Sequence, residues 1–301
     1  MGVITNMREY LIDFWKEFDY LAEDVAYLLA AYDKIVTNEE TSLIWSRMMK
    51  CYSEDIEHPF NDLLLEADNV ADRLEMHRYT AHLLLVQCMS RHLRSVYEEQ
   101  GLSMELYRGA MLDLRYKLEE CKLVRGIVGT FVGQWFDRFF NATRFAIGRL
   151  QFELISFGKE YQRNGLILKP ESTVINVHIP RTGTPMDVAS CDDSFRRAKD
   201  FYRARGEIGE LCVFYCSSWL LYPQNRRILS PKSNVYKFME RFDVFDFKLS
   251  PEGKDLWRLF DTDEKHPARL PADTFLRRAY IDHLKRGGLL GQGRGVYLFT
   301  K

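Results

Sequence analysis

The stretch from Ser172 to Tyr202, STVINVHIPRTGTPMDVASCDDSFRRAKDFY, decides the fold. Alternating apolar residues predict a strand over Val174–Ile179, and Pro180 ends the pairing of this strand because proline has no N–H to donate. Turn-forming residues follow, and a charged segment with helical spacing comes next. The order strand, loop, helix is typical of a mixed α/β domain, and its loop can present backbone N–H groups to an anionic ligand.

The loop after this strand is the first candidate for a ligand site. Four consecutive residues could point their backbone N–H groups at one spot: Arg181, Thr182, Gly183 and Thr184. Gly183 can adopt conformations that are closed to other residues. The guanidinium of Arg181 would add a charged fork suited to a phosphate.

The alternative for this loop is an ordinary connection between a strand and a helix. Ser190, followed three residues later by Asp193, is a self-capping pattern for the next helix. Asp192 and Asp193 would then occupy the first helical turn, where they would use the helix dipole and repel a phosphate. From these residues alone, both readings of the loop stay open.

The first half of the chain shows helical periodicity repeatedly and almost no strand-like alternation. One long helix is predicted from Met7 to about Tyr32. Thr37, with Glu40 three residues later, forms a capping-box pattern that predicts the start of the next helix, and Ser103 is predicted to cap a later one. The sequence therefore predicts an all-helical domain over residues 1–135.

The second half, residues 136–301, mixes strand and helix patterns. Alternation over Arg144–Leu154 predicts a strand. The apolar and aromatic segment Glu210–Leu221 predicts a central strand that is covered on both faces. The glycine-rich string Gly291–Gly295 is interpreted as a tight turn into the last strand. The predicted fold class is therefore α+β, with an all-helical domain followed by a domain in which helices pack on a mixed sheet.

Composition excludes several classes of function. The chain has 301 residues, a formal net charge of -1 and intermixed acidic and basic residues, so neither nucleic acid nor a membrane is an expected partner. No apolar run reaches the roughly 20 residues of a membrane helix, and no signal peptide is recognised. The six cysteines are scattered without a C-x-x-C motif, which predicts reduced thiols and a cytoplasmic protein. No histidine or carboxylate spacing predicts a metal site.

Three side chains are candidates for acid–base or leaving-group chemistry: His178, Glu153 and Ser218. His178 shares a strand face with Asn176, and it could act as a general base near neutral pH or be a hydrogen-bonded core histidine. Glu153 could be a base or part of a cross-strand ion pair. A cysteine-dependent mechanism would need Cys216 beside His178, and the alternative for this cysteine is an inert buried thiol.

Six strings of the second half occur in the same order in a family that this chain resembles, the bacterial acyltransferases of the Gcn5-related N-acetyltransferase (GNAT) type. The resemblance covers about Arg144–Lys301. The strings are HIP (residues 178–180, followed by Gly183), CDDSFRRAKDFY, CSSWLLYP, SNVYKFMERF, LPADTFLRRAYIDHLKRGG and GQGRG. The chain resembles the subgroup in which a helical N-terminal domain precedes a diverged acetyltransferase-like domain.

The resemblance implies a sheet that splays between its two central strands, with the pantetheine arm of an acyl-coenzyme A (acyl-CoA) in the splay. Strand Val174–Ile179 and the loop after it would contact the cofactor, and strand Leu211–Trp219 would form the other wall of this site. The residues that would hold the cofactor are Val177, Ile179, Arg181, Thr182, Gly183 and Thr184.

Two departures from the family pattern concern catalysis. Of the pyrophosphate loop R/Q-x-x-G-x-G/A, only Arg181 and Gly183 are present, and their spacing differs. Arg241 stands where the family places a tyrosine that protonates the leaving thiolate.

Together these features predict a cytoplasmic N-acyltransferase that uses acetyl-CoA or another acyl-CoA and needs no metal. The acceptor would be an amine on a small molecule or a peptide. His178 or Glu153 would take the proton from this amine, and Ser218 would hydrogen-bond the leaving thiolate. The alternative is a non-catalytic relative, a ligand- or protein-binding module that has lost the standard CoA site.

Overall fold

The computed structural model describes residues 6–163, 165–250, 253 and 256–300. The chain divides into two compact units between Phe145 and Ala146. Within the described residues, none of the helices combines the length and the apolar character that crossing a membrane requires.

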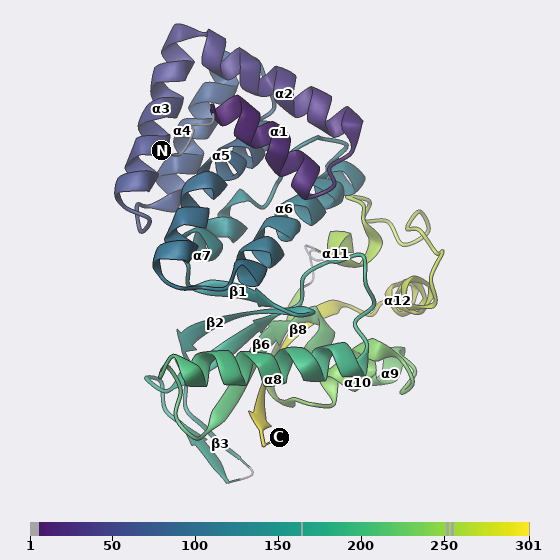
Figure 1. Ribbon diagram of the computed structural model, residues 1–301. Coiled ribbons are helices and arrows are strands. Elements are labelled where there is room, and N and C mark those ends of the chain that lie inside the picture. The colour runs from purple at the N-terminus through teal and green to yellow at the C-terminus, as the bar shows by residue number, and fades with distance from the viewer. Residues whose placement is uncertain (1–5, 164, 251–252, 254–255, 301) are drawn as a thin grey trace. The chain divides into compact units, whose positions relative to one another are not determined.

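The N-terminal unit is built from helices (Figure 1). Its elements are α1 (Met7–Glu17), α2 (Ala22–Thr37), α3 (Glu39–Glu54), α4 (Phe60–Arg73), α5 (Arg78–Glu99), α6 (Met104–Arg125), the 3₁₀ helix η1 (Gly133–Phe136) and α7 (Asp137–Phe140). Helix α5 contacts α1, α2, α3, α4 and α6. Residues 83–90 of α5 are buried without a break, as expected of a helix surrounded by others.

Two of the predicted helix boundaries in this unit are wrong. The segment predicted as one helix is divided into α1 and α2, and Asp19 between them has a left-handed backbone (φ 52) that an α-helix cannot contain. Thr37 is the last residue of α2, and Asn38 caps α3 by accepting the Thr41 N–H at 3.1 Å. The prediction for Ser103 is confirmed, because its hydroxyl oxygen accepts the Glu105 N–H at 3.1 Å and α6 follows.

The C-terminal unit is centred on a mixed sheet of six strands in the order β1-β2-β5-β6-β8-β7. The strands are β1 (Arg144–Ile147), β2 (Leu150–Ser156), β5 (Thr173–His178), β6 (Cys212–Ser218), β7 (Asp243–Ser250) and β8 (Leu290–Phe299). Strands β5 and β6 are parallel, whereas the pairs β2–β5, β6–β8 and β7–β8 are antiparallel. A separate hairpin consists of β3 (Tyr161–Arg163) and β4 (Leu166–Leu168). The predicted α+β class is confirmed.

Two predictions for the strands need correction. Arg144–Leu154 is not one strand, because Gly148 turns the chain between β1 and β2 with a φ of 65. The string Gly291–Gly295 lies inside β8 and is not a turn. A Cβ on Gly293 would come within 2.0 Å of the Leu221 carbonyl oxygen, so glycine lets the 3₁₀ helix η2 (Trp219–Leu221) pack directly on β8.

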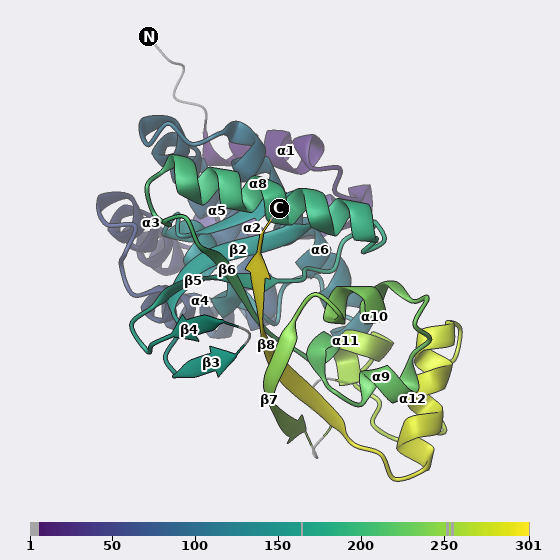
Figure 2. The same cartoon turned by 90° about the horizontal axis from the view of Figure 1, so that it is seen from below.

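One face of the sheet is apolar and is covered by α8 (Val188–Ala204), which lies along it in Figure 2. Phe195 of α8 is fully buried, and its ring contacts Phe214 with centroids 4.7 Å apart. Phe152 and Tyr297 contact the same ring at 6.1 and 5.3 Å. This aromatic layer fixes α8, and with it the loop that joins β5 to α8.

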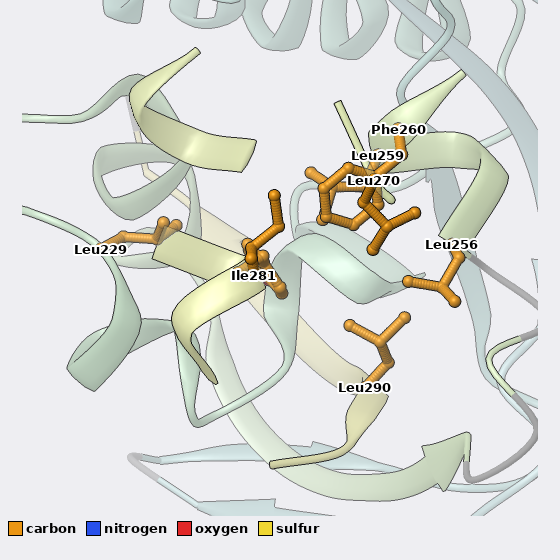
Figure 3. Packing of buried hydrophobic residues seen from close by; sticks show 8 residues of the cluster. Leu229, Leu256, Leu259, Phe260, Leu270, Ile281 and Leu290 are labelled. Atoms are coloured by element: carbon orange, nitrogen blue, oxygen red, sulfur yellow. The ribbon is translucent and has the colours of Figure 1, made fainter. Parts of the chain in front are cut away.

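A second, smaller core lies in the C-terminal unit among short helices (Figure 3). These helices are α9 (Asn225–Ile228), α10 (Asn234–Met239), α11 (Leu256–Phe260) and α12 (Phe275–Lys285). Leu229, Leu259 and Ile281 belong to this core. Tyr280 of α12 also belongs to this core, and its hydroxyl donates to the buried Asn225 side chain, which in turn donates to the Trp219 and Leu220 carbonyls. These contacts connect α9, α12 and η2 next to the end of β6.

Candidate active site

The sheet stops pairing between its two central strands at a specific point. In the described strands, the ladder between β5 and β6 consists of Ile175 opposite Phe214 and Asn176 opposite Tyr215. Beyond these pairs, β5 continues to His178 and β6 continues to Ser218. Parallel strands that continue without register pairing present their backbone edges to another group. The family resemblance implies a splay at this position, and the register agrees with it.

A carboxylate, an imidazole and an amide meet beside this point. The Glu153 Oε1 atom lies 2.6 Å from the His178 Nε2 atom and accepts a hydrogen bond from Asn176 Nδ2 at 3.0 Å. The β2–β5 register explains the cluster, because Glu153 lies opposite Asn176 and side chains in register share a sheet face. His178 lies two residues along the same face. The structure therefore brings together two of the three predicted catalytic residues and adds Asn176.

The hydrogen bonds in this cluster indicate which imidazole nitrogen carries the proton. Asn176 Nδ2 can only donate, and it lies 3.0 Å from Glu153 Oε1 and 3.1 Å from His178 Nε2. The 2.6 Å distance to the Glu153 carboxylate requires a proton on Nε2, since two lone pairs would repel each other so close together. The contact between Asn176 Nδ2 and His178 Nε2 then joins two donors and is not a hydrogen bond, and Nδ2 donates to Oε1 alone. In this tautomer Nδ1 bears the lone pair, so Nδ1 is the atom that can take up a proton.

The carboxylate and the imidazole of this cluster differ in how deeply they are buried. Glu153 is 6% exposed, whereas the His178 side chain is 20% exposed. A buried carboxylate needs hydrogen-bond donors to stay ionised, and here an amide and an imidazole provide them. The carboxylate is thus the inner, orienting member and the imidazole the outer member, the arrangement by which carboxylate–histidine pairs prepare a general base.

Sequence reasoning did not identify Asn176 or Gln151 as members of this cluster. Gln151 lies opposite His178 in the β2–β5 register and is 2% exposed. Its Oε1 atom has no hydrogen-bond partner among the residues described. Strand alternation placed Asn176 and His178 on one face, but Gln151 becomes their neighbour only through pairing with β2, which no local pattern reveals.

Ser218 lies apart from this cluster. Its hydroxyl oxygen accepts the Leu220 N–H at 3.2 Å and so caps η2. Register places Tyr215 on the face of Asn176, so alternation along β6 puts Ser218 on the opposite face, together with Cys216. The structure therefore does not bring Ser218 onto the face of Glu153 and His178.

The cysteine-dependent alternative is contradicted by the environment of Cys216. The side chain is fully buried, and burial raises the pKa of its thiol far above the ordinary value. A thiol that stays protonated is a poor nucleophile.

The candidate cofactor residues follow β5 directly. Val177 is buried in the strand, and Ile179 comes directly after its end. In the loop, Thr182 and Thr184 hydrogen-bond each other through their hydroxyl groups at 3.0 Å. Gly183 is exposed, does not have a left-handed backbone, and has open space where a Cβ would be. The fold itself therefore does not require glycine at position 183.

Arg181 is held by a residue that sequence reasoning did not single out. Its guanidinium forms an ion pair with Asp261. The second oxygen of the Asp261 carboxylate accepts a bond from Arg277 at 2.5 Å. No sequence motif marked Asp261, which lies in the segment between α11 and α12. A phosphate at the loop would share Arg181 with this carboxylate.

The start of α8 differs from its prediction. The N-cap is Asp187, whose carboxylate accepts the Ser190 N–H at 2.9 Å, so Ser190 does not cap the helix. The first turn carries no acidic residue, because α8 begins at Val188 and Asp192 lies in its second turn. Arg241 binds the Asp192 carboxylate at 2.8 Å and the Val188 carbonyl at 3.2 Å. Arg241, which stands where the family places its tyrosine, therefore stabilises the start of α8.

No group of three or more histidine, cysteine, aspartate or glutamate side chains in the described part of the chain could hold a metal ion.

Two family models match the chain. Residues 9–142 match the N-acyltransferase N-terminal domain, and residues 145–297 match the GNAT-like C-terminal domain. No curated protein matches the sequence.

Solved acyltransferase structures share the fold along nearly the whole chain. An acyltransferase in complex with decanoyl-CoA and teicoplanin is 20% identical, with 96% of this chain and 87% of that chain covered and a TM-score of 0.75. A mutant acyltransferase in complex with octanoyl-CoA is 20% identical, with 97% and 88% covered and a TM-score of 0.76. A third structure, with CoA and 10C-teicoplanin, gives 19% identity, 96% and 87% coverage and a TM-score of 0.74.

Proposed function

Because this chain belongs to the family of N-acyltransferases with a GNAT-like C-terminal domain, we propose that it transfers an acyl group from acyl-CoA to an amine. The single observation that carries the proposal is the 2.6 Å contact between Glu153 and His178, at the point where β5 stops pairing with β6. An oriented imidazole beside an unpaired strand edge is what deprotonation of an amine next to an extended thioester requires.

In the proposed reaction the amine nitrogen attacks the thioester carbonyl carbon. The new C–N bond forms, the C–S bond breaks, and CoA leaves as the thiolate. His178 Nδ1 takes the proton that the amine loses, and this proton then goes to the thiolate sulfur. Glu153 keeps the imidazole in its tautomer and stabilises the imidazolium that forms. Ser218 lies at the end of β6 on the sheet face opposite His178, so its hydroxyl would donate to the thiolate from that other face while its oxygen caps η2.

The donor would be held by the residues after the β5–β6 ladder. The backbone at Val177 and Ile179 would pair with the pantetheine arm as a neighbouring strand would. The loop Arg181–Thr184 would receive the pyrophosphate. The related structures contain decanoyl-CoA or octanoyl-CoA, which supports medium-chain acyl donors for this protein.

Teicoplanin in two of the related complexes supports a small-molecule acceptor with an amino group. All six cysteines are free thiols, which fits a reducing compartment, so a cytoplasmic location stays part of the proposal. The resemblance to bacterial acyltransferases supports a bacterial source.

The test is acyl transfer to a panel of amino sugars, teicoplanin and small peptides, followed by thiol release and by mass spectrometry of the amide. His178→Gln keeps a donor to Glu153 but removes the titratable nitrogen. We expect it to lower kcat/KM by about 10²- to 10⁴-fold while acyl-CoA binding is retained.

His82→Ala is the matched control, since it breaks a His82–Asp68 contact of 2.8 Å in the N-terminal unit. Full activity of His178→Gln, or an equal loss in the control, would contradict the proposed base.

The competing function is a binding module without catalysis. The specific observation in its favour is that Arg181 already has the Asp261 carboxylate as a partner. Acyl-CoA binding without thiol release for any amine of the panel would favour this alternative.

A further inference from the structure

A hollow of about 530 Å³ lies between α9 and α12 in the C-terminal unit. The two helices contact each other and lie side by side in Figures 1 and 2. The polar residues that matter for its chemistry are Arg227, Arg278, Arg286, Asp282 and His283. The volume is in the range of small-ligand sites.

The arginines of this hollow differ from their neighbours in the chain. Arg226 pairs with Glu240 at 3.1 Å, and Arg277 pairs with Asp261 and Asp273. Among the described residues, in contrast, Arg227, Arg278 and Arg286 make no ion pair with a carboxylate.

Within the part of the chain that the structure describes, Arg278 donates only to the backbone carbonyls of Ala272 and Asp273. With Asp282 as the single acidic residue of the lining, the hollow carries a formal charge of +2 while His283 is neutral. Three guanidinium groups that line one hollow with a single carboxylate among them are suited to an anion with several oxygens.

An apolar side of the hollow narrows the class of ligand. Ile228, Ala279 and Phe275 line it, and Phe275 is 61% exposed. An exposed aromatic ring beside guanidinium groups can stack with a flat base while the arginines bind phosphate. A phosphorylated nucleoside has both parts.

Ion pairs link the loop after β5 to α12, the helix that forms one side of the hollow. Arg181 of that loop pairs with Asp261, Asp261 pairs with Arg277 on α12, and Arg278 of the hollow is the next residue. A ligand that runs along this path would be long, with phosphates at its distal end. Acyl-CoA, the donor of the proposed function, has this form.

We propose that the hollow between α9 and α12 binds the 3′-phosphoadenosine end of acyl-CoA. This inference rests on the proposed function for the identity of the donor. The site compensates for the incomplete pyrophosphate loop, because it supplies three cationic groups where the loop supplies Arg181 alone. The same chemistry would also accept a free adenosine phosphate, and the test separates the two sources.

The experiment measures binding of decanoyl-CoA, decanoyl-pantetheine and 3′-phosphoadenosine 5′-phosphate to the whole chain by calorimetry. Arg227→Ala and Arg286→Ala are compared with Arg226→Ala, which lies next to Arg227 but outside the hollow. We expect each hollow variant to weaken decanoyl-CoA binding by about 10-fold, the effect of losing one charge-assisted bond. Binding of decanoyl-pantetheine should not change, and Arg226→Ala should behave as the wild type.

Equal decanoyl-CoA affinity in the hollow variants and the wild type would overturn the proposal. If the hollow variants lose only the free nucleotide, a separate nucleotide occupies the site and the assignment to CoA is wrong. Because decanoyl-pantetheine lacks the nucleotide, its binding and its acyl transfer report on the proposed function independently. Failure of that function would abolish both, whatever the hollow binds.

Discussion

A single carboxylate oxygen organises the polar cluster of this protein. Glu153 Oε1 receives both the His178 and the Asn176 contacts, so removal of either donor leaves a buried acceptor less satisfied. Such a loss costs more than an exposed hydrogen bond is worth, because the remaining group stays desolvated. The contact with Glu153 therefore favours one orientation of the His178 imidazole, and this orientation determines which nitrogen can take up a proton.

The loop glycine offers a test at the scale of one residue. Gly183→Ala should leave folding intact or raise the free energy of unfolding by about 0.4–1 kcal/mol, since the position has open space and does not need a left-handed backbone. If a phosphate approaches the backbone of this loop, the added methyl group should weaken acyl-CoA binding several-fold.

Chemical denaturation and calorimetry measure the two effects of Gly183→Ala. Gly209→Ala, which also has open space around its Cβ, is the control. Unchanged acyl-CoA affinity in Gly183→Ala would mean that the cofactor does not contact this loop.

For single residues, the sequence predicted which strand face a side chain occupies but not which residues it contacts. His178 and Asn176 were placed on one strand face because alternation is local. The contact with Glu153 depends on the pairing of β2 with β5, and the contact of Arg181 with Asp261 depends on a loop 80 residues away. The cap of α8 was assigned to Ser190 because serine is a good cap, but Asp187 is an equally good one three residues earlier.

At the scale of elements, β8 shows how glycines shape the sheet. Gly291, Gly293 and Gly295 face Tyr222, the Leu221 carbonyl and Phe242, while Arg294 points to the other face and pairs with Asp246 at 2.8 Å. The alternation of glycine with larger residues over 291–295 therefore lets η2 pack on one face, while Gln292 and Arg294 lie on the other.

Gly293→Ala should destabilise the C-terminal unit. A Cβ there would overlap the Leu221 backbone, and relief requires a shift of η2 or β8 that costs about 1–3 kcal/mol or more. Thermal unfolding measures the loss. A variant with wild-type stability would show that η2 does not pack on β8 as described.

The start of α8 gives a prediction about pH. The hydrogen bond from the Ser190 N–H lowers the pKa of Asp187 from its usual 3.8. Its contribution to the free energy of unfolding is therefore complete above the unfolded pKa and is lost as the pH falls through the lower folded pKa. Asp187→Asn keeps a capping oxygen but cannot titrate.

Denaturant unfolding at a series of pH values measures this contribution. The wild type should lose stability more steeply than the Asn variant between about pH 4 and pH 2. Parallel profiles would contradict the assigned cap.

The elements themselves were largely predictable where their periodicity was long. The central strand β6 follows from its apolar run, and the order of β5, loop and α8 follows from alternation and helical spacing. Breaks were missed where a single residue turns the chain, as at Asp19 and Gly148, because a left-handed backbone leaves little trace in the pattern. Both the β1–β2 turn and the α1–α2 break are of this kind.

At the scale of the whole molecule, the change from helical to strand periodicity predicted an all-helical part followed by a mixed sheet. The two family models divide the chain at nearly the same place as the two compact units. The hollow between α9 and α12 could not be foreseen, because its arginines come from segments about 50 residues apart that only the fold brings together.

The most direct test of the account is calorimetric titration of the full chain with decanoyl-CoA, with free decanoate as the control ligand. We predict saturable binding of decanoyl-CoA with a Kd between about 1 µM and 1 mM, and much weaker binding of decanoate. The absence of decanoyl-CoA and acetyl-CoA binding at millimolar concentration would contradict the central claim that this protein is an acyl-CoA-dependent N-acyltransferase.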